Sequence, residues 1–507
     1  MKSLKDIDSF GSTDADHDEY LLESFEDHEA YISILERKKY LIVGRKGAGK
    51  TAIFKKIITT KSSDYFSYGH TFSDYPWHYH DKQARVGIPD FDKFTHSWKY
   101  LIYLTISKII LNHDQSLPYN EECFLEMGKI ERFVVDSYGT RDPDITQIFT
   151  PSKRLKIKPT FEIDWKLLKA SVEAENVPIE DLPVIIQDIN KSLSDSIFKV
   201  LNPANRYIIC FDQLDLGFNP KDSEYSNRLI GLLLAAKDIN NTAKSFKKNL
   251  FITILLRDDI YNSLQFEDKN KITENYLSAI EWDTARTNNT LKSLMEKRFN
   301  LILGENKENI TWDNVFDSNQ EMPGHQNKYQ YLRDRTFLRP RDLIKFCNSA
   351  LSAHKARLVD PKRSDKELFI NEDILEARSS YGDYFLREID DEVHKHLPNY
   401  KNYLEIFRSI GVYRFPIAAF NEEYNKRKES LKEVSNSLDI LKGLYRFSII
   451  AFYRSGGKGK GGSTYVYKYQ NPELDFDEMT QHIEVHPGLM EVLGLKRYET
   501  KSLKYDP

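Results

Sequence analysis

Cysteine is scarce in this sequence of 507 residues, where Cys123, Cys210 and Cys347 stand far apart. No pair has CxxC spacing and no His/Cys cluster has zinc-site spacing, so the pattern is typical of a reducing compartment. Long apolar runs are missing too, because none approaches the roughly 18 residues that a membrane-spanning helix needs. The N-terminus, MKSLKDIDSFGSTDADHDEY, is polar and acidic, unlike a secretion signal. These absences predict a cytoplasmic protein with no membrane partner.

Neither sign of charge dominates, since 73 Lys and Arg face 77 Asp and Glu, giving a net charge of −4. The chain as a whole therefore presents no nucleic-acid-binding surface, and such a contact would need a local basic patch. Hydrophobic residues make up 40% of the chain and aromatic residues 13%, which is ample for packed cores. The length predicts about three domains. We see no catalytic set typical of a nuclease, a protease or a TIR-type enzyme, so such an activity would belong to a partner.

The most specific motif is GRKGAGKT, residues 44–51, which fits G-x-x-x-x-G-K-[ST]. An apolar strand precedes it and a helix follows it, as this phosphate-binding loop requires. The glycines let backbone N–H groups turn toward phosphate oxygens, and the helix N-terminus adds its positive dipole end. Lys50 would reach the β- and γ-phosphates, and the Thr51 hydroxyl would bind Mg²⁺. The candidate ATP-binding residues are Gly44, Arg45, Lys46, Gly47, Ala48, Gly49, Lys50, Thr51 and Ala52.

A second candidate follows the apolar stretch YIICFD, which ends at Asp212. An acid in this position is the Mg²⁺ ligand of P-loop NTPases. Many ATPases carry next a glutamate that orients the attacking water, but this chain has Gln213. Glutamine can position water and is a poor proton acceptor, so Asp215 is the alternative, although it could instead cap the next helix. We favour Asp215, and we expect slow turnover or tight binding rather than fast motor activity.

The pattern of elements predicts an α/β fold. Four strand-like runs alternate with helical segments, which is typical of a parallel sheet covered on both faces. These runs are KKYLIVG, FSYGHTFS, YIICFD and NLFITILLR. Residues of about 111–200 read as a helical insertion, residues 1–18 as a flexible N-terminus, and the chain after 285 as mostly helical.

Several segments together resemble the STAND and KAP-type P-loop ATPases, which are related to the origin-recognition-type AAA+ ATPases. In chain order they are GRKGAGKT, HSWKYL, IICFDQLD, NLFITILLRDD, IEWDTARTNNTLKSLMEKRF and RPRD. The resemblance covers residues of about 20–350 and implies a P-loop ATPase domain at 19–300 and a helical lid at 301–385. The remaining residues, 386–507, resemble a winged helix.

The resemblance also implies roles for two arginines. Arg257 matches a sensor residue near the γ-phosphate, and Arg341 matches the lid arginine of a second sensor. Arg339 takes that role if the register is off by two. The chain departs from the family where it has D-Q-L-D in place of D-D-L-D. Bacterial ATPases with this layout often resemble anti-phage defence or stress-response components, which implies an effector or sensor protein as partner and a homo-oligomer.

A basic hairpin is predicted near the C-terminus, where YRFSIIAFYRSGGKGKGGSTYVYKYQ gives two strands joined by a Gly-rich turn. Arg454, Lys458 and Lys460 lie on or beside this turn. In a winged helix such a turn contacts the DNA backbone, with salt-dependent and sequence-independent affinity. The alternative is a solvated tip that keeps the hairpin from pairing with other strands.

Three functions remain open from the sequence. The first is an ATP-controlled switch with slow Mg²⁺-dependent hydrolysis that governs assembly with, or activation of, a partner. The second is a DNA-binding ATPase that uses the C-terminal hairpin to sense or load on DNA. The third is a scaffold that holds ATP without hydrolysing it. We favour the first.

Overall fold

The computed structural model describes residues 1–72, 90–149, 182–215, 222–305, 309–431, 436–456 and 462–497. Contacts divide the chain into two compact units. The parallel-sheet unit comprises Asp27–Arg45 and Lys50–Ile280. The C-terminal unit comprises Met1–Glu26, Lys46–Gly49 and Glu281–Pro507. The middle of the predicted phosphate-binding loop therefore groups with the C-terminal unit, while its two ends group with the parallel-sheet unit.

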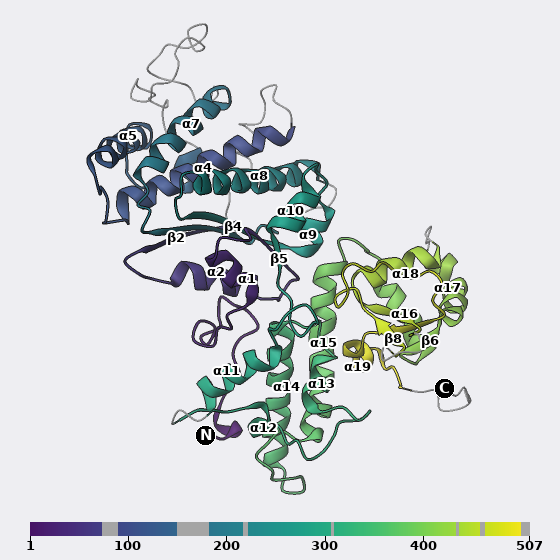
Figure 1. Ribbon diagram of the computed structural model, residues 1–507. Coiled ribbons are helices and arrows are strands. Elements are labelled where there is room, and N and C mark those ends of the chain that lie inside the picture. The colour runs from purple at the N-terminus through teal and green to yellow at the C-terminus, as the bar shows by residue number, and fades with distance from the viewer. Residues whose placement is uncertain are drawn as a thin grey trace. The chain divides into compact units, whose positions relative to one another are not determined.

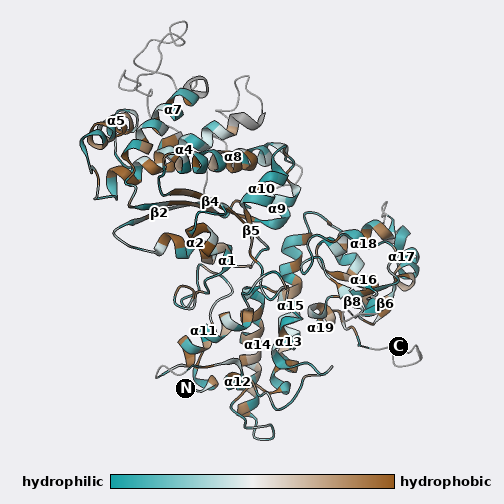
Figure 2. Cartoon of the chain, in the orientation of Figure 1, coloured by the Kyte–Doolittle hydropathy of each residue, from teal (hydrophilic) through white to brown (hydrophobic). Residues whose placement is uncertain are grey.

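A five-stranded parallel sheet forms the centre of the parallel-sheet unit, which confirms the predicted α/β class. The strand order is β2-β3-β4-β1-β5. Strands β1, β3 and β4 are buried along almost their whole length, as expected for a sheet covered on both faces, and Figure 2 shows the hydrophobic colour of β4. The strands are β1 (Leu41–Gly44), β2 (Tyr65–Thr71), β3 (Arg206–Asp212), β4 (Leu250–Arg257) and β5 (Leu277–Ala279).

Helices lie on both faces of this sheet (Figure 1). Helix α2 (Lys50–Thr59) packs on one face, and α4 (Asp90–Asn112) and α8 (Ser223–Ser245) pack on the other. Trp98 of α4 is fully buried and donates its indole N–H to the carbonyl of Arg228 on α8 at 2.8 Å, which ties the two helices together. The described residues of this unit also form α1 (Glu29–Leu35), α5 (Glu121–Tyr138), α6 (Ile145–Phe149), α7 (Leu182–Val200), α9 (Asp258–Ser263) and α10 (Lys269–Tyr276).

The described residues of 111–200 form helices α5, α6 and α7, with turns and loops between α4, α5 and α6. The basic stretch SKRLKIKPT lies outside the described residues. Among the described residues, no helix combines the length and the hydrophobicity that crossing a bilayer requires.

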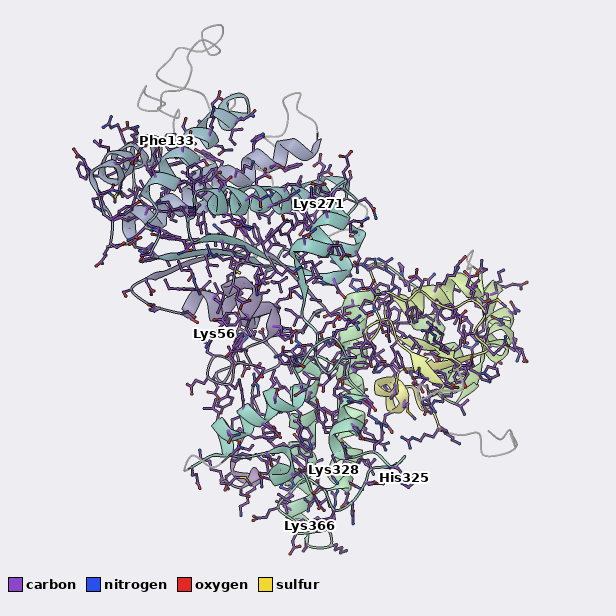
Figure 3. The ribbon with its side chains drawn as sticks, viewed as in Figure 1. Lys56, Phe133, Lys271, His325, Lys328 and Lys366 are labelled. Atoms are coloured by element: carbon purple, nitrogen blue, oxygen red, sulfur yellow. The ribbon has the colours of Figure 1, made fainter. Side chains whose placement is uncertain are left out.

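The C-terminal unit begins its helical part with α11 (Leu291–Leu303), α12 (Trp312–Val315), α13 (Lys328–Arg333), α14 (Pro340–Val359) and α15 (Asn371–Val393). Helices α14 and α15 pack together, and the buried Arg357 of α14 joins them through an ion pair of 2.7 Å with Asp373 of α15. Nearby, Lys366 pairs with the carboxylate of Asp317 at 2.8 Å, and Lys328 donates to the backbone carbonyl of Asp317. Figure 3 labels both lysines.

The N-terminal segment is part of this helical core. It contains the short 3-10 helix η1 (Leu4–Asp6), and the side chains of Leu4, Ile7 and Phe10 are buried. Asp18 forms a buried ion pair with Arg298 of α11. Residues 1–18, for which the sequence suggested a flexible segment, therefore supply core and ion-pair contacts, because their few apolar side chains find partners far along the chain.

The last part of the C-terminal unit joins helices to a four-stranded antiparallel sheet of order β6-β9-β7-β8. Strands β7 and β8 form the predicted hairpin and pair Tyr453 with Tyr465. Arg454 is exposed at the end of β7, whereas Lys458 and Lys460 lie outside the described residues. The winged helix remains a prediction. The elements are α16 (Tyr400–Ile410), β6 (Arg414–Pro416), α17 (Ile417–Leu431), α18 (Ser437–Arg446), β7 (Ile450–Arg454), β8 (Thr464–Val466), β9 (His482–Val485), η4 (Pro487–Leu489) and α19 (Met490–Leu493).

Candidate functional site

The GRKGAGKT motif occupies the turn between a buried strand and a helix, as its sequence predicts. Strand β1 ends at Gly44 and helix α2 begins at Lys50. Gly47 has a φ of +79° and Gly49 a φ of +112°, values that residues with a side chain rarely adopt. The backbone of this loop therefore requires glycine at both positions.

Lys50 is held at the base of this turn. Its amine donates to the carbonyls of Gly44 at 2.8 Å and Arg45 at 2.9 Å. Burial lowers the pKa of Lys50, while the charges of Asp215 and Asp212 act in the opposite direction. The sheet thus places a partly buried cation close to two carboxylates at the end of β3.

Asp212 ends β3 and is only 2% exposed. Its Oδ2 atom is buried and has no hydrogen-bond partner among the described residues. Burial raises the pKa of Asp212 to about 6, although the backbone N–H of Gln213, the charge of Lys50 and a hydrogen bond with Thr51 oppose this. A buried carboxylate oxygen that lacks a partner, next to a hydroxyl, is the oxygen donor set that Mg²⁺ prefers.

The donor set also limits how a metal would bind. No group of three or more His, Cys, Asp or Glu side chains suited to a metal ion exists in the described part of the chain. Mg²⁺ commonly keeps several waters and binds through one or two protein ligands together with substrate phosphates. Asp212 and Thr51 therefore fit a magnesium nucleotide better than a metal ion held by protein alone.

Gln213 and Asp215 follow Asp212 in an unusual turn. Gln213 has a φ of +60°, a left-handed conformation that is uncommon outside glycine and marks local strain. The carboxylate of Asp215 accepts from Nη1 of Arg257 at 3.2 Å. Both candidates for orienting water therefore lie at the end of β3. Gln213 has the left-handed backbone conformation, and Asp215 is held by its ion pair with Arg257.

Arg257, the predicted sensor residue, ends the strand beside the one that leads into the loop. Strand β4 is the neighbour of β1, and the register sets Arg257 opposite Gly44. Its guanidinium also holds Asp259 with two bonds, from Nε at 2.9 Å and from Nη2 at 2.7 Å. Two carboxylates therefore engage this arginine in the structure.

Within the C-terminal unit, other side chains hold the middle of the loop by its carbonyl groups. Nη1 of Arg339 donates to the carbonyl of Lys46 at 2.9 Å. The indole N–H of Trp282 donates to the carbonyl of Ala48 at 3.0 Å. The amine of Lys46 pairs in turn with Asp391 of α15 at 2.5 Å.

Arg341, the predicted lid arginine, and Arg339, its alternative, both lie at this segment and make different contacts. Arg339 is 1% exposed and acts through its hydrogen bond to the loop. Arg341 packs its aliphatic carbons against Gly47, so that a Cβ on this glycine would come within 3.2 Å of them. The guanidinium of Arg341 binds the carbonyl of Thr13 at 2.9 Å and the carboxylate of Glu388 at 3.2 Å.

Sequence reasoning missed Trp282 and the acidic residues of α15. Nothing in the sequence separates Trp282 from an ordinary core tryptophan, because its donor role depends on a carbonyl 234 positions away. Glu388, Asp391 and Glu392 gave a weak signal, since their spacing of three and four places them on one helix face.

A protein-family model described as the FunZ-associated C-terminal helical domain matches residues 289–390. The matched span runs from just before α11 to near the end of α15 and includes Arg339, Arg341 and Glu388. The helical part of the C-terminal unit is thus similar to this domain. A comparison with curated proteins gives no match.

Proposed function

We propose that this protein binds ATP with Mg²⁺ at residues 44–52, hydrolyses it slowly, and uses the nucleotide state to control assembly with, or activation of, a partner. One observation carries the proposal: the buried carboxylate of Asp212, whose Oδ2 has no partner among the described residues, lies close to Thr51 and to the amine of Lys50. A buried polar atom without a partner is costly, and a bound cation would satisfy it. The positive φ angles of Gly47 and Gly49 support a phosphate-binding loop.

Each residue would have a separate task. Lys50 would neutralise phosphate charge, and Asp212 and Thr51 would hold Mg²⁺, which supplies further charge stabilisation to the phosphates when bound. Gln213 or Asp215 would orient the attacking water, and Arg257 would stabilise charge as it develops. Asp215 would first have to exchange its bond with Arg257 for one with water, which favours slow turnover.

The proposed partner is an effector or sensor protein. This part rests on the resemblance to switch-type P-loop ATPases and on the match of residues 289–390 to the FunZ-associated domain. We place the protein in anti-phage defence and expect a homo-oligomer. Size-exclusion chromatography with light scattering, with and without Mg²⁺-ATP, tests the assembly part, and an unchanged mass in both conditions would contradict it.

Turnover by purified wild-type protein, beside Lys50→Ala and Asp215→Ala, tests the central claim. We expect hydrolysis by the wild type, loss of nucleotide binding in Lys50→Ala, and binding without turnover in Asp215→Ala. ATP binding that Lys50→Ala abolishes, with no turnover under any condition, would instead indicate a scaffold that holds ATP. Failure of the wild type to bind ATP would refute the proposal.

A second candidate function is a DNA-engaged ATPase. It is favoured by the exposed Arg454 at the end of the β7–β8 hairpin, next in sequence to Lys458 and Lys460. Duplex DNA in the turnover assay, at two salt concentrations, distinguishes this candidate. It predicts stimulation that falls steeply with salt and that is lost when all three residues are replaced by alanine.

A further inference from the structure

The carbonyl groups of the loop segment 46–49 are held by two buried donors of the C-terminal unit. Arg339 binds the carbonyl of Lys46, and Trp282, which is 4% exposed, binds the carbonyl of Ala48. These are alternate peptide groups of the same short loop. Because the peptide bond is planar, fixing these carbonyl groups also fixes the N–H groups of Gly47 and Gly49.

In a trans peptide the carbonyl of one residue and the N–H of the next point in opposite directions. Fixing the carbonyl of Lys46 therefore directs the N–H of Gly47 away from Arg339. Fixing the carbonyl of Ala48 directs the N–H of Gly49 away from Trp282 in the same manner. Neither N–H donates to an acceptor within the described residues. Two free N–H groups with fixed orientation are the donors that an anion-binding loop needs.

Arg339 is itself rigidly held. Its Nε and Nη2 donate to Asp342 at 2.8 and 2.9 Å, and its Nη1 also donates to Glu392 at 2.5 Å. Asp342 is fully buried and also accepts the backbone N–H of Phe337 at 3.0 Å. Charge-assisted, bidentate bonds of this kind fix the orientation of a guanidinium. The donor that reaches Lys46 is therefore fixed before any ligand arrives.

We infer that Trp282 and Arg339 are positioning residues for phosphate binding, acting through the carbonyl groups of Lys46 and Ala48 and not by touching the nucleotide. The inference rests on the proposed function and extends it. It assigns to these two side chains the task of orienting two amide donors for the oxygens of a polyphosphate.

The sharpest test is Trp282→Phe, which keeps an aromatic ring and removes the N–H donor. Trp312→Phe is its matched control, because Trp312 is also buried, at 3% exposed, and its indole N–H has no partner among the described residues. We expect Trp282→Phe to weaken binding of Mg²⁺-ATP and of tripolyphosphate by about 2- to 12-fold, as loss of one neutral hydrogen bond predicts. Trp312→Phe should bind both ligands like the wild type.

A purely structural role for Trp282 would give a different result. The melting temperature without nucleotide should differ little between the two variants, whereas the stabilisation by Mg²⁺-ATP should be smaller in Trp282→Phe. Weaker ATP binding with unchanged tripolyphosphate binding would overturn the inference, since the effect would then not concern the phosphates.

Arg339→Lys gives an independent test, with Arg357→Lys as control. Lysine keeps the charge but cannot serve Asp342 with two bonds and also reach the carbonyl of Lys46. Arg357 is equally buried and paired with Asp373, and its hydrogen bonds lie within the α14–α15 region. Both variants should lower the melting temperature, but only Arg339→Lys should also weaken Mg²⁺-ATP binding. Equal affinities in the two variants would count against the inference.

Lys50→Ala separates the failure of this inference from the failure of the proposed function. Suppose the wild type binds Mg²⁺-ATP and Lys50→Ala loses it, while Trp282→Phe matches Trp312→Phe. The positioning role is then wrong and the binding site stands. If the wild type itself binds no ATP, the proposed function and the positioning role fall together.

Discussion

Two buried aspartates, one in each unit, show how a site differs from a structural network. Asp212 is 2% exposed and Asp342 is fully buried. Both oxygens of Asp342 accept bonds from Arg339, and one also accepts a backbone N–H. Asp212 keeps one buried oxygen without a partner among the described residues. The carboxylate of Asp342, whose oxygens all have partners, stabilises the fold. The unpartnered oxygen of Asp212 lowers the stability of the folded protein, and a bound cation would offset this loss.

The largest effect is expected from removing charge at the satisfied site. Asp342→Asn removes one of the two carboxylates that pair with the buried Arg339 in the described part of the chain, and we expect a loss of about 3–5 kcal/mol in the free energy of unfolding. Denaturant titration measures this loss. Asp212→Asn, as control, should be neutral or stabilising without ligand. An equal loss of stability in both variants would show that Asp212, like Asp342, serves mainly to stabilise the fold.

The next effect is a pH dependence of the free energy of unfolding that arises from the titration of Asp212. Because burial raises its pKa to about 6, the folded state binds a proton that the unfolded state releases near pH 4. The stabilising contribution is therefore complete below pH 4 and is lost as the pH rises to about 6, by about 2–3 kcal/mol in total. The difference in unfolding free energy between wild type and Asp212→Asn, followed from pH 4 to 7, should fall accordingly. A flat difference would contradict a buried, unpaired carboxylate.

Metal dependence is expected to differ between the same two proteins. Chelation of Mg²⁺ should weaken ATP binding by the wild type, because the unpaired oxygen of Asp212 then loses its cation. Asp212→Asn should bind Mg²⁺ in the presence of ATP at least about tenfold more weakly, and chelation should change its ATP affinity less. Isothermal titration with and without chelator measures both quantities. An identical response to chelation would remove Asp212 from the metal site.

The smallest effect concerns the loop backbone. Gly47→Ala forces a side chain into a φ of +79° and into contact with Arg341, so we expect a loss of about 1 kcal/mol in stability. Gly128→Ala in α5, where an added Cβ meets nothing within 4 Å, should instead gain about 0.5–1 kcal/mol. Thermal unfolding of both variants checks the contrast, and a gain in Gly47→Ala would show that the loop is not held as described.

Local patterns in the sequence predicted the elements that depend on neighbours in the chain. The apolar run 249–257 contains β4, and Gly47 and Gly49 of GRKGAGKT adopt the positive φ angles that suit glycine. The place of Arg257 also followed, because it ends a strand of a parallel sheet. These features need only periodicity, turn chemistry and strand order.

Contacts between distant positions could not be predicted in this way. Lys46 and Arg339 are 293 positions apart, and only the folded chain shows that the guanidinium of Arg339 binds the loop while Arg341 packs against Gly47. The buried packing of Phe10 escaped prediction for the same reason, since a short polar segment with a few apolar residues has no periodicity of its own.

The ion pair between Asp18 and Arg298 sets an order of events during synthesis. The two residues are 280 positions apart, and the residues between them contain the parallel-sheet unit. At about 5–20 residues per second, a ribosome needs roughly 14–56 s to make that interval. Throughout this time Leu4, Ile7 and Phe10 have no partner from α11 or α14, while the parallel-sheet unit is synthesised and becomes free to fold before α11 exists. Leu4, Ile7 and Phe10 are therefore made before the parallel-sheet unit but buried after it, and nascent chains stalled before α11 should leave them open to proteases and chaperones.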